Sequence, residues 1–185
     1  MVQHLDLETT NNVQQPLLPL PGRAAIYTRV AASQERQTRQ AQTTDLVALV
    51  CENGFSAQQI TVYEESNVSG RTPFSRRPAL SKLLDDITEP PSETEPIKAI
   101  FVSSEDRLFS DADGVEVSTF METCIQHGVL LITPTSEYDF TNPAHVALFR
   151  FRCEAAGQHA ERMIIRRLQA GKQHKRQMQQ QKQQM

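Results

Sequence analysis

The stretch Ala24–Val30 (AAIYTRV) is a short, mostly apolar run with a basic residue near its end, and it predicts the first strand of the fold. A polar connection and an amphipathic helix pattern follow, and the same order repeats along the chain. Three further short apolar runs predict strands at residues 60–63, 97–102 and 129–132. The alternation predicts an α/β fold: a mostly parallel sheet of about four strands with helices on both faces, followed by a long C-terminal helix.

Helix boundaries are marked by glycine and proline. Pro78 is suited to the first turn of a helix, and the leucines and isoleucine at positions 80, 83, 84 and 87 then form one apolar stripe. Gly54 and Gly128 predict the ends of the helices before and after this one, because glycine tolerates the left-handed conformation found just past a helix end. Residues 88–96 (TEPPSETEP) predict a linker.

The chain divides into three regions by composition. Residues 1–22 are polar and proline-punctuated, and we expect a disordered leader. Residues 23–142 carry the strand and helix pattern and form the expected core. Residues 143–185 contain no proline after Pro143 and predict one long basic helix with a glutamine-rich tail.

The long helix carries a narrow apolar seam. Its members recur at alternating spacings of four and three residues, which is typical of a helix packed against a partner helix. They are Phe149, Cys153, Ala156, Ala160 and Met163. The seam therefore predicts a homodimer or higher oligomer; the alternative is a helix that folds back on its own domain.

Charge is distributed unevenly. The whole chain has a net charge of -3, with 19 basic and 22 acidic residues. Residues 162–185 hold seven of the basic residues and no acid, so the remainder carries 12 positive and 22 negative charges, a net of -10. A cationic tail on an acidic body is expected of a segment that contacts a nucleic-acid backbone, although a solvated helix end without a partner would look the same. The residues expected to contact double-stranded DNA are Arg166, Arg167, Lys172, Lys175 and Arg176.

Several classes of protein are disfavoured. No apolar run approaches the roughly 20 residues that span a bilayer, and the N-terminus lacks the pattern of a secretory signal, so we expect a cytoplasmic protein without a membrane partner. Cys51, Cys124 and Cys153 are far apart and predict buried reduced thiols. The histidines show no ligand spacing with them, so neither a metal nor another cofactor is expected.

Two loops leave strand ends with polar residues, at 29–40 and 103–113. In a parallel sheet, sites form at the carboxyl ends of the strands, so the chemistry is expected there.

The residues around these loops resemble a known family. Four blocks occur in order: residues 26–30 (IYTRV), residues 63–70 (YEESNVSG) with 77–80 (RPAL), residues 105–108 (EDRL), and Glu161-Arg162 followed by Ile165. Together they are similar to the motifs of the N-terminal catalytic domain of serine recombinases, the resolvase and invertase family, over residues 24–175. Each block is weak alone, and four in order are strong.

The resemblance implies site-specific DNA recombination by phosphoryl transfer. In the family a serine hydroxyl attacks the scissile phosphate and forms a 5′-phosphoserine link without a metal, so arginines must stabilise the charge on the phosphate oxygens. It implies that the long helix forms the dimer interface and leads its basic end across the DNA. The residues at matching active-site positions are Arg29, Arg77, Asp106, Arg107, Arg162 and Gln40.

Two positions depart from the family pattern. Ala31 stands where the nucleophilic serine is expected, and Ser110 stands where a second arginine follows Arg107. A methyl group cannot attack phosphorus, and loss of a covalent nucleophile costs on the order of 10⁶ in rate. Ser33 is a possible substitute, but it lies two residues further along the chain.

Three functional hypotheses therefore stand. The first is a DNA-binding member of the family with impaired catalysis, acting alone or in mixed assemblies with active relatives. The second is an active recombinase or invertase that uses Ser33 or receives missing parts from partner subunits. The third is an α/β binding module with no role on DNA, although no glycine-rich phosphate loop follows the first strand.

Overall fold

The structure is a computed structural model, which describes residues 21–30, 36–66, 68, 72–109 and 114–183. Most of the expected leader lies outside the described residues, as do Ala31, Ser33 and Ser110. The division of the chain into three regions stays a prediction.

A five-stranded sheet forms the centre of the molecule. Its strands are β1 (Arg23–Val30), β2 (Ile60–Ser66), β3 (Ile97–Phe101), β4 (Leu130–Thr133) and β5 (Ser136–Tyr138). The order is β2-β1-β3-β4-β5; the first four strands are parallel, and β5 is antiparallel to β4. The predicted α/β sheet is confirmed, with one strand more than expected. The extra strand has only three residues and follows a tight turn, so it leaves no apolar run for the sequence to reveal.

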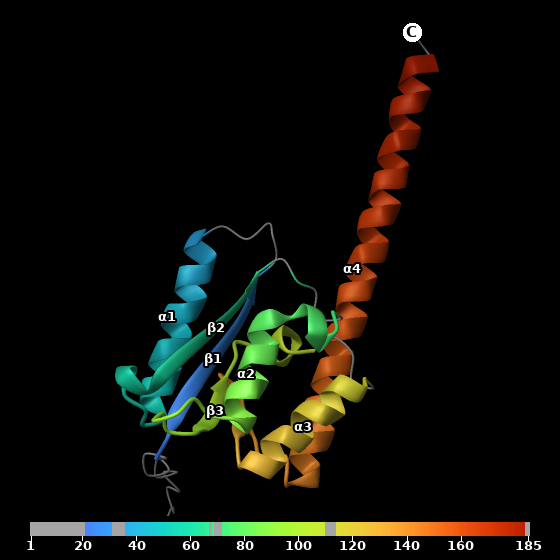
Figure 1. Ribbon diagram of the computed structural model, residues 1–185. Coiled ribbons are helices and arrows are strands. Elements are labelled where there is room, and N and C mark those ends of the chain that lie inside the picture. The colour runs from blue at the N-terminus through green and yellow to red at the C-terminus, as the bar shows by residue number, and fades with distance from the viewer. Residues whose placement is uncertain (1–20, 31–35, 67, 69–71, 110–113, 184–185) are drawn as a thin grey trace, which may run out of the picture.

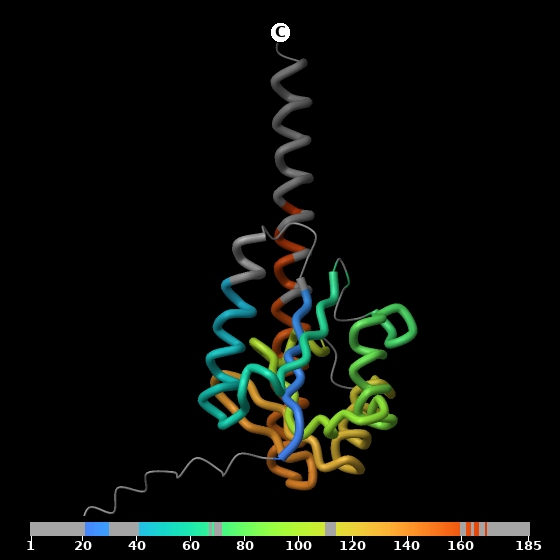
Figure 2. Tube along the Cα trace, turned by 60° about the vertical axis from the view of Figure 1, so that its left-hand side comes forward, coloured from blue at the N-terminus to red at the C-terminus, as the bar shows by residue number. Residues whose placement is uncertain are grey.

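Helices cover both faces of the sheet (Figure 1). They are α1 (Arg36–Glu52), α2 (Pro78–Thr88), α3 (Val115–His127) and α4 (Pro143–Gln183). On one face α1 packs over Ala24 and Ile26, while α2, α3 and the start of α4 cover Ala25 and Tyr27 on the other, because alternate side chains of a strand point to opposite faces. Figure 2 shows α1 and α2 on opposite sides of β1 and β2.

The predicted helix boundaries agree with the structure. Pro78 occupies the first turn of α2, where its missing N–H would have no helical partner. Gly128 ends α3 with φ +62°, and its N–H bonds to the carbonyls of Cys124 and Ile125. Gly54 follows α1 with φ +87°. These positions require the left-handed backbone that glycine adopts without strain.

The long helix α4 begins within the core and ends far outside it. Its 41 residues span about 60 Å at ~1.5 Å per residue, and in Figure 1 its second half extends away from the sheet. Phe149 and Cys153 are fully buried in the chain's own core, where the Phe149 ring contacts Phe109, Phe120 and Tyr138. The predicted seam is therefore wrong at these two positions: spacings of four and three also suit a helix packed on its own domain.

The cysteines differ in their surroundings. Cys124 and Cys153 are buried thiols as predicted, and burial raises the pKa of both, that of Cys153 to about 12. Cys51 is exposed, which corrects the prediction, because α1 turns Leu46 and Val50 toward the sheet and leaves position 51 on the outer side. Among the described residues no group of His, Cys, Asp and Glu side chains is arranged to hold a metal ion. No helix in the described part of the chain is both long and apolar enough to cross a membrane.

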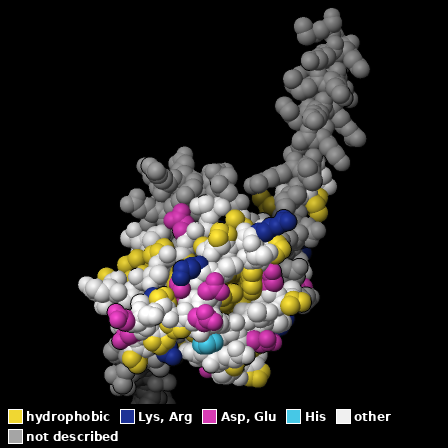
Figure 3. Space-filling model, viewed as in Figure 1, with side chains coloured by type: hydrophobic (Ala, Val, Ile, Leu, Met, Phe, Trp, Pro, Cys, Tyr) yellow, Lys and Arg dark blue, Asp and Glu magenta, His cyan; other side chains and the backbone are white. Residues whose placement is uncertain are grey.

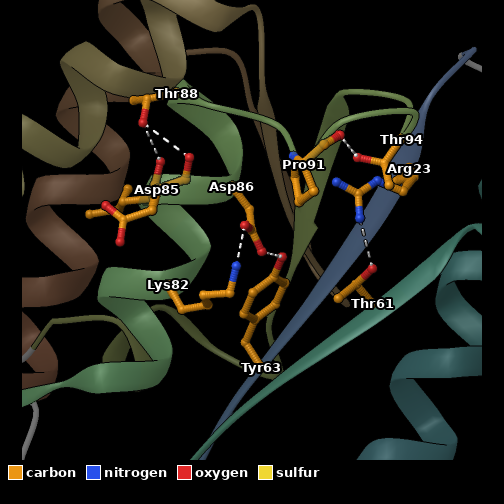
Figure 4. Close-up of polar contacts among 10 residues, drawn as sticks. Arg23, Thr61, Tyr63, Lys82, Asp85, Asp86, Thr88, Pro91 and Thr94 are labelled. Atoms are coloured by element: carbon orange, nitrogen blue, oxygen red, sulfur yellow. Dashed lines mark hydrogen bonds and ion pairs between the residues drawn. The ribbon is translucent and has the colours of Figure 1, made fainter.

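A buried carboxylate fastens α2 to the edge strand β2 (Figure 4). Asp86 accepts hydrogen bonds from the hydroxyl of Tyr63 at 2.7 Å and from the ammonium group of Lys82. Burial alone would raise the pKa of Asp86, but the bonds from Lys82 and Tyr63 and the charges of Lys82 and Arg23 outweigh it and lower that pKa. The carboxylate is thus ionised and paired, which explains how an acid is accommodated next to the core.

Candidate active site

The carboxyl ends of β1 and β2 and the loop after β3 meet at one edge of the sheet. Arg29 lies near the end of β1 and pairs in register with Glu65 on β2. The chain leaves β3 at Phe101 and forms the short 3₁₀ helix η3 (Glu105–Arg107) beside them. Parallel strands place their carboxyl ends together, so residues about 80 positions apart become neighbours, as the sequence predicts.

Arg29 and Arg107 bind each other's backbone. Arg29 donates from Nε to the carbonyl oxygen of Arg107 at 2.9 Å and from Nη2 to that of Asp106 at 2.6 Å. Its Nη1 reaches the carbonyl oxygen of Val68 at 3.0 Å. Arg107 in turn donates from Nη1 to the carbonyl oxygen of Arg29 at 3.2 Å. The two guanidinium groups therefore fix the end of β1 to η3.

Arg77 is fully buried beneath this pair. Its Nη1 donates to the carbonyl oxygen of Leu108 at 2.5 Å, and its Nη2 donates to the Tyr27 hydroxyl at 2.7 Å and to the Arg107 carbonyl at 3.2 Å. The rings of Tyr27 and Phe109 lie 5.6 and 5.9 Å from the guanidinium carbon, within cation–π range. In this conformation Arg77 is enclosed and acts as a positioning residue for η3. Its predicted place among the active-site arginines stays a prediction.

The cluster keeps an excess of positive charge. Most of its guanidinium hydrogen bonds go to backbone carbonyls, which satisfy the N–H groups without neutralising the charge. Asp106 lies 3.6 Å from Arg107, and the carboxylate of Glu65 is buried at the start of α2, where it accepts a bond from the N–H of Leu80. Within the described part of the chain, the three guanidinium groups of Arg29, Arg77 and Arg107 thus face two carboxylates, a net of +1 (3 − 2).

The pKa of Arg29 reflects both its burial and the neighbouring positive charges. Burial lowers its pKa, and the positive charges of Arg107 and Arg77 lower it further, against the opposing charge of Asp106. Arg107 and Asp106 are partly open to solvent, with 24% and 33% of their side chains exposed. The Nε atoms of Arg77 and Arg107 are buried and have no hydrogen-bond partner among the described residues. An anion approaching the Arg107 side would therefore relieve repulsion among the cations.

The structure thus brings together four of the six predicted site residues: Arg29, Arg77, Asp106 and Arg107. Arg162 is exposed on α4, and none of the contacts described here joins it to the cluster. Gln40 lies on α1, but its side chain is outside the described residues. The same holds for the side chains of Arg167, Lys172, Lys175 and Arg176 on α4, whereas Arg166 is described and exposed.

The sequence did not predict two sets of contacts near this edge, those of Tyr27 and those of Glu105. Tyr27 supplies a hydroxyl to Arg77 from the middle of an apolar strand, and the only signal was a polar atom at an inward strand position. Glu105 is buried and binds Tyr138 and Arg152, which come from β5 and α4. Nothing in the local sequence around Glu105 indicates partners 33 and 47 residues away.

Comparison with known proteins decides the family. The family described as "Resolvase, N terminal domain" matches residues 24–181, most of the chain. The chain belongs to the resolvase N-terminal domain family. No curated protein sequence matches it.

Two solved structures show the same fold as this resolvase-family chain. The N-terminal catalytic domain of TP901-1 integrase is 20% identical, with a TM-score of 0.50; the match covers 76% of this chain and 98% of that one. A resolvase family site-specific recombinase from Streptococcus pneumoniae is 19% identical, with a TM-score of 0.52; the match covers 84% of this chain and 99% of that one. The resemblance drawn from the four sequence blocks is thereby confirmed for family and fold.

Replacing Arg77 by methionine tests its positioning role. Methionine fills much of the space but leaves the buried carbonyl of Leu108 without its donor, so we expect the free energy of unfolding to fall by about 3 kcal/mol. Denaturant unfolding measures the change. Arg76→Met, at the exposed neighbouring position, is the matched control and should leave the unfolding midpoint nearly unchanged. Equal midpoints for the two variants would contradict the positioning role.

Proposed function

We propose that this chain binds the sugar-phosphate backbone of duplex DNA through the cluster of Arg29 and Arg107, and that its strand-cleaving activity is impaired. Membership of the resolvase family supports site-specific recombination as the general function. The observation that carries the proposal is the interlocked arginine pair at the carboxyl edge of the sheet, which retains a positive excess. Guanidinium groups match phosphate oxygens in geometry and stay charged at any relevant pH.

A phosphoryl-transfer site needs cations that stabilise the phosphate and a nucleophile, and the cluster can supply the cations. Arginines can stabilise the charge that develops on the phosphate oxygens, which is the larger part of catalysis in such reactions. The other requirement is the nucleophile, and Ala31 offers only a methyl group at the matching position. We therefore expect DNA to be held without efficient cleavage. An active enzyme that uses Ser33, or that completes its site with partner subunits, is the alternative.

Helix α4 supports a role in DNA contact. Arg162 and Arg166 are exposed on it, and from residue 162 onward the sequence contains basic residues but no acid. The visible face of the body in Figure 3 instead carries several acidic side chains. Because phosphates attract the helix and repel much of the body, DNA is expected along the second half of α4.

The exposed side of α4 offers a surface for a second copy of the chain. Phe151, Leu148 and Ile165 are 68%, 39% and 47% exposed, and Phe151 and Ile165 are 14 residues, or two heptads, apart. Since Phe149 and Cys153 are buried in the chain's own core, we place the partner-facing stripe about these three residues and Met163, the seam member that is 37% exposed. This arrangement supports a homodimer, or a mixed assembly with active relatives, in which two helices lie side by side.

The DNA-binding proposal predicts a change in salt dependence. Arg107→Gln keeps a polar side chain but removes the charge, so affinity for duplex DNA should fall and the slope of log K against log salt should shrink by about 1. Fluorescence anisotropy with a labelled duplex at several salt concentrations measures both. Lys98→Gln removes the same charge at the opposite end of the sheet and is the control. Identical slopes for the two variants would count against the cluster as a phosphate site.

The catalytic proposal predicts the outcome of a trapping experiment on supercoiled plasmid. The parent chain should form no covalent protein–DNA adduct, because Ala31 has no attacking oxygen, whereas Ala31→Ser should form one if the remaining site is competent. Denaturing gels of quenched reactions detect the adduct. An adduct in the parent chain that disappears in Ser33→Ala would instead establish the active alternative.

The proposed dimer face predicts a charge-sensitive association. Phe151→Lys should shift the sedimentation equilibrium of the chain toward monomer, because a buried ammonium group would replace an apolar contact. Val115→Lys introduces the same charge at an exposed apolar position of α3 and should leave association unchanged. A parent chain that stays monomeric at rising concentration would contradict the proposal that this side of α4 forms a dimer interface.

A further inference from the structure

Glu105 begins the 3₁₀ helix that carries Asp106 and Arg107, but its own side chain bonds to β5 and α4. It is buried and accepts hydrogen bonds from the Tyr138 hydroxyl on β5 and from Nη1 of Arg152 on α4, the latter at 2.9 Å. Arg152 donates from the same nitrogen to the Thr135 hydroxyl at 3.0 Å. Strand β5 and helix α4 therefore both bond to the one carboxylate of η3.

The backbone of Glu105 supports the arginine cluster directly. Its carbonyl oxygen accepts the N–H groups of Leu108 and Phe109 at 3.0 and 3.1 Å, which closes the turn. The carbonyls of the next three residues, 106–108, are those that Arg29 and Arg77 bind. A shift of Glu105 would therefore displace the acceptors that position both guanidinium groups.

The carboxylate depends on Arg152 to stay where it is. A buried ionised acid is costly unless it is paired, and Arg152 is its only cationic partner among the described residues. Without Arg152, one hydroxyl would remain to hold the charge, so the carboxylate would move toward water. This movement would loosen the start of η3.

We propose that Glu105, Tyr138 and Arg152 are positioning residues that couple the orientation of α4 to the arginine cluster. Building on the proposed phosphate-binding role of that cluster, a phosphate held there and a correctly seated α4 favour each other. The coupling is reciprocal by thermodynamic linkage: contacts that α4 makes with DNA or a second copy also tighten the cluster. Helix α4 and the arginine cluster thus change position together when either one binds DNA, although Arg152 itself contacts no phosphate.

The chain supplies a matched control for this coupling. Arg150 lies two residues before Arg152 on the same helix, carries the same charge, and donates to Ser118 on α3 instead of to η3. Arg150→Met and Arg152→Met therefore remove equal charge within one turn of α4, from opposite sides of the helix. Only Arg152→Met removes the bond to Glu105. A difference between the two variants therefore reports the coupling through Glu105 and not a long-range effect of the lost charge.

The first measurement is amide hydrogen exchange on the full chain without DNA. Arg152→Met should speed exchange at Leu108 and Phe109, whose N–H groups bind the Glu105 carbonyl, and Arg150→Met should not. Arg152→Lys, which keeps a cation near Glu105, should restore much of the protection. Thermal melting of each variant verifies that the chain is folded. Equal exchange in both methionine variants would overturn the proposal.

The second measurement is a double-mutant cycle on duplex DNA binding. Arg152→Met should weaken binding about threefold to tenfold in the parent chain but have no further effect in the Arg107→Gln background. Additive effects would mean that Arg152 acts independently of the cluster and would contradict the coupling. If Arg107→Gln itself leaves DNA binding unchanged, the phosphate-binding role fails, while selective loss of protection in Arg152→Met would still support the link between α4 and η3.

Discussion

Three consecutive backbone carbonyls, those of Asp106, Arg107 and Leu108, decide how this molecule is built at its functional edge. The 3₁₀ turn uses the carbonyls of Ser104 and Glu105 for its own hydrogen bonds, so the next three have no partner within the turn. Buried carbonyls must be bonded, and here the donors are the guanidinium groups of Arg29 and Arg77. The same groups that complete the fold also bring cations to the end of the sheet.

Arginine suits this double requirement better than any other side chain. Each planar guanidinium carries five N–H groups, so one residue can bind two or three carbonyls at once, whereas lysine offers a single nitrogen. Carbonyls accept hydrogen bonds but leave the charge in place, and burial together with the neighbouring charges of Arg107 and Arg77 lowers the pKa of Arg29. Most N–H groups of the cluster are therefore bonded while its positive charge is not neutralised, which favours the binding of an anion.

Much of the fold follows from the sequence, because the strands, the helix stripes and the stops at Gly54 and Gly128 are local signals. The convergence of Arg29 with Arg107 also follows from the sequence, since parallel strands end at one edge.

The burial of Arg77 could not be predicted from the sequence. Arg76 and Arg77 are adjacent and chemically identical, and only the packing of η2 (Phe74–Arg76) and α2 makes one exposed and the other enclosed. The apolar spacing on α4 is equally ambiguous, because a helix that packs on its own domain and one that packs on a partner share the same period. The link from Glu105 to α4 depends on tertiary contacts across more than 30 residues, which no local pattern encodes.

The arginines of the cluster stabilise the fold, and this limits what their presence indicates about catalysis. Losing Arg77 would leave a buried carbonyl unpaired, and losing Arg29 would release η3, so the fold requires these side chains whether or not a DNA strand is cut. Arginines at matching family positions are therefore poor evidence of a working recombinase. The proposed nucleophile position is different, because a serine hydroxyl there would serve chemistry. Under the proposed function the alanine at position 31 therefore bears on activity, while the cations of the cluster bear first on stability and then on phosphate binding.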